Sequence, residues 1–269
     1  SPFFNLLAIL SVFAVLTWML LRQGEKPWRL ALICGLCAGG AFLVMSPQIL
    51  FQSRSFFGSV KVLQKPDQKI RVLMHGSTVH GAQNDDPALE REALTYYHQS
   101  GPFGAIYKAV VAPPGERSVG IVGLGTGTQV VYGEKGDQFS FFEIDPLIEK
   151  IAKTDTLFTF LKNASCEWNI ILGDARLSLT QGGSFEFDLL VLDAFSSDAI
   201  PIHLLTREAM VLYISSVASK GLLAFHISNR YLDLRPVVGA LVQDAGWSAF
   251  VKYGKQDSGS PSFKISPSI

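Results

Sequence analysis

The hydrophobic positions of this chain follow two patterns, one before residue 52 and one after it. Residues 3–21 and 30–51 are apolar runs without a charged side chain. Each is close to the roughly 20 residues that cross the hydrocarbon core of a bilayer. The polar segment 22–29 leads directly into the second run, whereas a signal peptide ends at a small-residue cleavage site before a polar mature start. The pattern predicts an N-terminal transmembrane helical hairpin, with residues 1–52 as a membrane anchor.

A short, β-rich region follows. Segments 60–63 and 69–73 flank the turn sequence Lys65-Pro-Asp-Gln68 and predict a β-hairpin. Residues 75–83, rich in glycine and histidine, are expected to form a loop or a short strand end, and helices are expected at 87–99 and 103–111. Residues 112–116 hold Pro-Pro-Gly, which interrupts regular structure. We therefore expect a small N-terminal β and linker domain over residues 53–112.

The remaining residues alternate between short apolar runs and helix-like segments. Continuous apolar strands that are covered by helices on both faces are typical of a parallel, doubly wound sheet. The pattern predicts an α/β fold with a Rossmann-like, methyltransferase-type domain over residues 113–269. The expected strands are 119–122, 139–142, 169–172, 189–192, 222–225 and 248–251.

Composition excludes several classes of function. The net charge is zero and no basic stripe is present, so nothing indicates a nucleic-acid partner. Three cysteines argue against a disulfide framework. No histidines have the spacing of metal ligands, so no metal is expected. Gly35 and Gly39 form a G-x-x-x-G pattern in the second apolar run, which predicts a contact with a second copy or another membrane helix.

The candidate chemistry lies at the predicted strand ends. The glycine loop Gly123-Leu-Gly-Thr-Gly127 follows the first strand of the sheet, and carboxylates follow the next three: Glu143 with Asp145, then Asp174, then Asp193. Ligands of open parallel sheets bind outside the carboxyl ends of the strands, so these residues are expected to share one crevice. The loop fits neither the dinucleotide nor the P-loop pattern. It predicts a nucleoside ligand without phosphates, such as an S-adenosyl sulfonium compound.

Each carboxylate has a specific expectation. Glu143, about twenty residues past the loop, suits a ribose diol, and Asp174 suits the adenine amine. Asp145 and Asp174 each precede a helical segment, so helix capping is the alternative at both. Asp193 and Asp198 lie after the fourth strand, where carboxylates would hold a cationic amine and accept its proton. For Asp198, ordering a turn and capping a helix is the alternative.

These motifs resemble the spermidine synthase (polyamine aminopropyltransferase) family, and more narrowly its membrane-bound bacterial branch. The resemblance covers about residues 56–247. It implies a protein, often dimeric, that transfers an aminopropyl group from decarboxylated S-adenosylmethionine to a diamine. It implies catalytic contacts at Tyr97, Asp193 and Asp198, and donor contacts at Gln83, His98, Gly123, Gly125, Thr126, Gly127, Glu143, Asp145 and Asp174.

Four positions depart from the family pattern, and the family's Asp-x-x-Asp spacing is stretched here to Asp193-x-x-x-x-Asp198. The family has an aspartate in the glycine loop where this chain has Thr126, an Asp-Glu pair where it has Ala93 and Leu94, and a glutamate where it has Gln99. Two alternatives therefore stay open. One is a methyltransferase that uses intact S-adenosylmethionine, whose carboxylate an aspartate at position 126 would repel. The other is a non-catalytic membrane subunit with a nucleotide-like fold.

The anchor and the resemblance together predict a location. We expect an integral protein of a bacterial inner membrane, in contact with lipid, with its α/β domain on the cytoplasmic side where the donor occurs. The expected small-molecule partner is an amine.

Overall fold

The computed structural model describes residues 35, 40, 47–182, 185–194, 201–228 and 232–253. The chain divides into two compact units, one formed by residues 1–48 and 65–68 and the other by residues 49–64 and 69–269. Two β-sheets belong almost entirely to the larger unit. These sheets position the residues of the candidate site.

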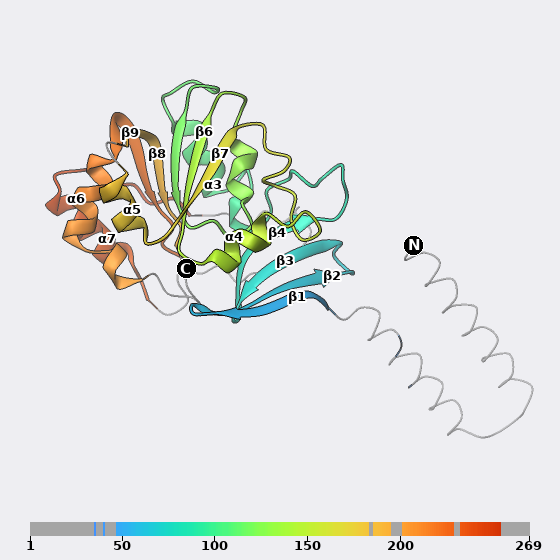
Figure 1. Cartoon of the computed structure of the whole chain (residues 1–269). Coiled ribbons are helices and arrows are strands. Elements are labelled where there is room, and N and C mark those ends of the chain that lie inside the picture. The colour runs from blue at the N-terminus through green and yellow to red at the C-terminus, as the bar shows by residue number, and fades with distance from the viewer. Residues whose placement is uncertain are drawn as a thin grey trace, which may run out of the picture. The chain divides into compact units, whose positions relative to one another are not determined.

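The first sheet has four strands in the order β1-β2-β3-β4 (Figure 1). The strands are β1 (Gln48–Ser55), β2 (Gly58–Lys65), β3 (Ile70–His75) and β4 (Thr78–Asn84). Strand β4 occupies residues for which a loop or short strand end was expected. It pairs antiparallel with β3, with Thr78 opposite His75. The two residues between them, Gly76 and Ser77, form the short glycine-containing turn that is typical of a hairpin.

The predicted transmembrane hairpin and integral-membrane location are contradicted. Among the described residues, no helix is long and apolar enough to cross a bilayer. The second apolar run ends in strand β1 instead, where Phe51 packs on the main core. A run without charge does not by itself distinguish a helix from a strand that faces a core. Apart from Gly35, Gly40 and residues 47–51, both runs lie outside the described residues, as does Gly39 of the predicted helix contact.

The second sheet contains five parallel strands within the described residues, in the order β7-β6-β5-β8-β9 (Figure 1). Strand β5 lies at the centre, so the strand order reverses beside it, as at the ligand crevice of open α/β sheets. The predicted Rossmann-like parallel sheet is confirmed. Its strands are β5 (Ser118–Val122), β6 (Gln138–Glu143), β7 (Glu167–Leu172), β8 (Phe187–Leu192) and β9 (Val217–Phe225).

Alternating side chains of this sheet build a core on each face. Ile121 and Phe141 point into one core, which includes helices α3 (Pro102–Ala109) and α4 (Pro146–Ala152). Val122 and Phe142, the next residues along, point into the other, which includes α5 (Ala175–Gln181) and α6 (Arg207–Ser215). A side-chain period of two explains why adjacent residues serve opposite cores. Helix α7 (Arg235–Asp244) follows β9.

Two predicted elements are wrong. Residues 87–99, expected as a helix, form turns and the short 3-10 helix η1 (Thr95–Tyr97). Residues 248–251, expected as a strand, have no regular structure, and Phe250 is 97% exposed. These four residues pair with no strand in the part of the chain that the structure describes.

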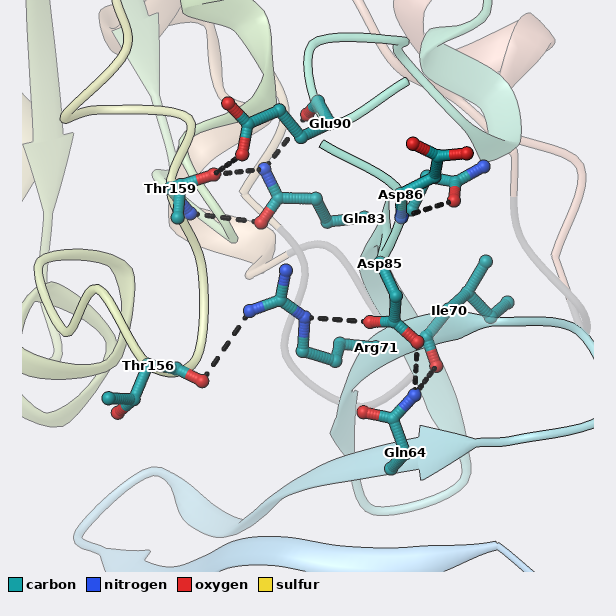
Figure 2. Close-up of polar contacts among 10 residues, drawn as sticks. Gln64, Ile70, Arg71, Gln83, Asp85, Asp86, Glu90, Thr156 and Thr159 are labelled. Atoms are coloured by element: carbon teal, nitrogen blue, oxygen red, sulfur yellow. Dashed lines mark hydrogen bonds and ion pairs between the residues drawn. The ribbon is translucent and has the colours of Figure 1, made fainter. Parts of the chain in front are cut away.

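Polar contacts tie the first sheet to the segment that follows α4 (Figure 2). The guanidinium of Arg71 donates from Nε to Asp85 at 3.0 Å and from Nη1 to the carbonyl of Thr156 at 3.4 Å. Gln64 also donates to Asp85. These bonds hold the C-terminal end of β4, from which the chain continues to the tyrosines of η1.

Candidate active site at the strand ends

The glycine loop after β5 has little room for side chains. Gly123, Gly125 and Gly127 all have positive φ angles, of 101°, 55° and 77°. A Cβ atom on Gly123 would lie 2.5 Å from the carbonyl oxygen of Asp193, and one on Gly125 would lie 2.8 Å from that of His80. Both neighbours are backbone atoms, so neither moves aside cheaply. The loop therefore passes directly against the chain that carries Asp193.

Replacing Gly123 with Ala is expected to destabilise the protein by about 2 kcal/mol, because an L side chain is strained at positive φ and the new Cβ presses on Asp193. Gly239 is a matched control, since it lies in helix α7 with nothing within 4 Å of its Cβ position. Gly239→Ala should stabilise by about 0.5–1 kcal/mol. Urea unfolding measures both, and equal unfolding free energies for the two variants would refute the strain at Gly123.

Glu143 closes strand β6 and holds the glycine loop. Its Oε2 accepts the N–H of Leu124 at 3.0 Å, and its Oε1 accepts the N–H of Asp145 at 2.9 Å. The residue is 8% exposed. Burial raises the pKa of Glu143, although the backbone N–H groups oppose this shift. The carboxylate is therefore oriented by the backbone on both of its oxygens.

Asp145 and Asp174 cap helices, as the sequence alternative allowed. Asp145 accepts the N–H of Leu147 at 2.9 Å at the start of α4. Asp174 accepts the N–H of Arg176 at 2.8 Å at the start of α5, and its other oxygen lies 3.3 Å from Nε2 of His203. A hollow of about 360 Å³ adjoins Asp174, which is within the size range of small-molecule pockets. It is lined by Asp174, Arg176, Leu177, Thr180, His203, Glu208 and Leu212.

Gln83 and His98 make their polar contacts away from the strand ends. The buried amide of Gln83 donates to the hydroxyl of Thr159 at 2.8 Å and to the carbonyl of Glu90 at 2.9 Å, and it accepts the N–H of Thr159 at 2.9 Å (Figure 2). His98 is partly exposed and bonds through Nδ1 to Ser100 at 2.8 Å. Gln83 therefore positions the segment after α4.

Thr126, at the position of the family's loop aspartate, is packed against β4. Its hydroxyl shares a hydrogen bond of 2.6 Å with that of Thr128, and it is 1% exposed. A Cβ atom on Gly81 would lie 2.4 Å from its Oγ1. The loop thus presents a neutral, buried side chain at this point.

Asp193, directly after β8, is the centre of a buried polar cluster. Its Oδ2 accepts the phenol of Tyr97 at 2.6 Å, and its Oδ1 lies 2.6 Å from Nδ1 of His226. Gln129 approaches Oδ2 at 3.5 Å, and Tyr96 donates to the oxygen of Tyr97 at 3.0 Å. The side chain of Asp193 is only 2% exposed. The cluster brings together residues that lie about a hundred positions apart in sequence.

The two tyrosines act as donors. Burial, with the nearby charge of Asp193, raises the pKa values of Tyr96 and Tyr97 well above the ordinary value for a phenol. Both phenols therefore stay protonated, and Tyr97 keeps donating to the carboxylate.

Sequence reasoning assigned no role to His226 and did not consider Gln129. His226 directly follows strand β9, and its N–H bonds to the carbonyl of Leu192 at 2.9 Å. The strand-end rule that selected Glu143, Asp174 and Asp193 applies equally to the fifth strand, and it would have found this histidine. The predicted Asp198 lies outside the described residues. In the part of the chain that the structure describes, no group of three or more His, Cys, Asp or Glu side chains is arranged to hold a metal ion.

The chain is similar to known proteins in sequence and in fold. No family model matches the chain. In sequence, the chain is 27% identical over 202 residues to a polyamine aminopropyltransferase of Vibrio vulnificus. The aligned region covers 72% of this chain and 63% of that protein. The chain thus spans less than two thirds of this relative.

Solved structures of similar fold include a spermidine synthase from Thermotoga maritima. Its TM-score is 0.53 at 15% identity, and the match covers 74% of this chain and 63% of that one. A probable spermidine synthase from Corynebacterium glutamicum has a TM-score of 0.57 at 14% identity, and the match covers 74% of this chain and 71% of that one. A spermidine synthase in complex with the transition-state analogue AdoDATO has a TM-score of 0.55 and 15% identity, covering 74% and 64%. These three structures share the fold of this chain, and the Vibrio vulnificus protein is similar to it in sequence over 202 residues. The comparisons therefore support the predicted resemblance to the spermidine synthase (polyamine aminopropyltransferase) family, without distinction of its membrane-bound branch.

Proposed function

We propose that this chain transfers an aminopropyl group from decarboxylated S-adenosylmethionine to an amine. The observation that carries the proposal is the position of Asp193. Its carboxylate is held by Tyr97, and its backbone carbonyl touches the Cβ position of Gly123 in the glycine loop. An amine attracted by the charge of Asp193 would therefore lie near a donor held by the loop. The sequence relationship to a polyamine aminopropyltransferase supports the same reaction.

The donor is assigned to the glycine loop and the ends of β6 and β7. Glu143 is oriented by two backbone N–H groups, and each carboxylate oxygen retains a second lone pair for a ribose hydroxyl. Asp174 directly follows Gly173 after β7, at the same edge of the sheet, and we assign it to the adenine amine. The positive-φ backbone of Gly125 and Gly127 allows close approach of the ligand. We assign Asp145, Gln83, His98 and Thr126 to positioning of these segments.

The reaction needs little chemistry beyond placement. The amine nitrogen attacks the carbon beside the sulfonium, and the leaving thioether needs no proton, so orientation supplies much of the rate. An alkyl amine with a pKa near 10 must first lose a proton. Asp193 orients that amine by charge, and the rigid Tyr97 phenol holds the carboxylate in place.

Product analysis by mass spectrometry tests the proposal. The protein is incubated with decarboxylated or intact S-adenosylmethionine and with 1,4-diaminobutane or 1-aminobutane. Methylthioadenosine together with an amine that has gained an aminopropyl group would support it. S-adenosylhomocysteine with a methylated amine would instead identify a methyltransferase, the reading that the neutral Thr126 favours. Release of neither product, with no binding of either donor by calorimetry, would leave a non-catalytic subunit.

A further inference from the structure

His226 is held on both ring nitrogens and on its ring face. Nδ1 lies 2.6 Å from Oδ1 of Asp193, and Nε2 hydrogen-bonds to the hydroxyl of Ser228. The ring centroid lies 4.4 Å from that of Tyr96 and 6.0 Å from that of Phe103, which meets it edge-on. The histidine side chain is 15% exposed. This histidine therefore has one defined orientation at the end of β9.

The partners of the ring determine where its proton lies. An ionised carboxylate only accepts hydrogen bonds, so Nδ1 carries the hydrogen that points at Asp193. In the neutral ring Nε2 is then the acceptor, and the hydroxyl of Ser228 donates to it. Both oxygens of Asp193 are already engaged, Oδ1 by His226 and Oδ2 by Tyr97. In this arrangement, the basic nitrogen that can take up a proton is Nε2 of His226.

Resting on the proposed transfer reaction, we propose that His226 takes up the proton that the acceptor amine must lose, with Ser228 as the relay. Asp193 then orients the ring and stabilises its charged form. Two titratable side chains in contact with His226 are Asp193 from the end of β8 and Tyr96 from η1. Tyr96 stays protonated, so Asp193 is the charged member of this pair.

The proton and electrons balance in this scheme. The acceptor ammonium, attracted by the charge of Asp193 and hydrogen-bonded to Ser228, gives a proton to Oγ of Ser228 while Ser228 gives its own proton to Nε2 of His226. The amine lone pair then forms the new C–N bond to the carbon beside the sulfonium. The C–S bond breaks with both electrons going to sulfur, which becomes the neutral thioether of methylthioadenosine. The product is a secondary ammonium, and the imidazolium returns its proton to water.

The test is the pH dependence of His226→Asn. Asparagine keeps an N–H donor toward Asp193, but it cannot take up a proton. With decarboxylated S-adenosylmethionine and 1,4-diaminobutane, kcat at about pH 7 should fall about 100-fold while KM changes little. The deficit should shrink steadily toward about pH 10, where the amine itself arrives unprotonated. Ser228→Ala should show the same trend with a smaller loss. A purely structural defect would lower kcat equally at every pH.

Ser215→Ala provides a matched control, because Ser215 is a surface serine of α6 that donates to the carbonyl of Leu212. It should keep the wild-type kcat and pH profile. A wild-type kcat profile in His226→Asn, or an equal loss at every pH, would overturn the role of His226 while leaving the transfer reaction intact. Failure of the wild-type protein itself to release methylthioadenosine would overturn both proposals.

Discussion

Asp193→Asn is expected to lower kcat for aminopropyl transfer by about 10³-fold, because it removes the charge that orients the amine and the acceptor that orients His226. Asparagine has only one acceptor oxygen, whereas Asp193 receives Tyr97 on one oxygen and His226 on the other. The new amide N–H would face a donor on one side, and the charge that holds the amine and the imidazolium would be gone. Binding of methylthioadenosine, measured by calorimetry, should change little because the adenosine contacts are assigned to other strands.

The matched control for this substitution is Asp155→Asn. Asp155 is 53% exposed in its side chain and pairs with Lys162 at 2.7 Å on the surface. Exposed ion pairs contribute little to stability, so this variant should keep wild-type kinetics. If Asp193→Asn and Asp155→Asn had the same kcat, Asp193 would have no part in the reaction, and the assignment of the acceptor site would have to be abandoned.

The sheet was largely predictable because strands buried on both faces appear in the sequence as short runs of consecutive apolar residues. Strands such as β5 and β8 are short runs whose apolar side chains enter one core or the other. The same logic located the strand-end carboxylates without any structure, since parallel strands bring their carboxyl ends to one edge. Helix capping at Asp174 was foreseen as an alternative for a similar reason, as a carboxylate before a helix accepts its first N–H groups.

The incorrect predictions have a common physical cause. A local sequence pattern does not reveal which distant segment a strand or side chain will contact. The apolar run that ends at Phe51 joins a sheet, and β4 depends on pairing with β3 rather than on its own composition. The hydrogen bond between Tyr97 and Asp193 joins residues 96 positions apart, and no spacing rule predicts it. His226 was missed although it directly follows β9, because the sequence showed only its place at a strand end and not its contact with Asp193.

A second large effect is expected far from the carboxyl ends of the strands, where the segments before β5 and β6 are joined by a buried ion pair. Asp137 is fully buried and accepts the N–H groups of Gly115, Arg117 and Glu134 at 2.7, 3.0 and 2.8 Å, together with the Nε–H of Arg117 at 3.0 Å. Asp137→Asn leaves the guanidinium of Arg117, itself 6% exposed, without its counter-charge. Breaking such a pair typically costs about 3–5 kcal/mol, and urea unfolding at pH 7 should show a loss of this size.

The same pair predicts how stability depends on acid. Burial opposes the charge of Asp137, but the Arg117 guanidinium and the backbone N–H groups outweigh it and hold the pKa of Asp137 below its usual value. A carboxyl whose pKa is lowered by folding stabilises the native state above its unfolded pKa of about 3.9. That stability is lost as pH falls through the lower folded pKa. The gap in unfolding free energy between wild type and Asp137→Asn should therefore be constant at neutral pH and narrow below about pH 4.

Asp137 is expected to affect the stability of the protein but not its catalytic rate. Asp137 lies before β6, at the amino ends of the strands, whereas Asp193 and Glu143 lie at the carboxyl ends. The folded fraction of Asp137→Asn, assayed at low temperature, should keep a kcat close to wild type even though its unfolding free energy is several kcal/mol lower. A gap that stays constant down to about pH 2.5 would show that Asp137 does not gain its stability from ionisation. A large loss of kcat in the folded variant would contradict this prediction. It would mean that the loss of the Asp137–Arg117 ion pair alters the geometry at the opposite end of the sheet.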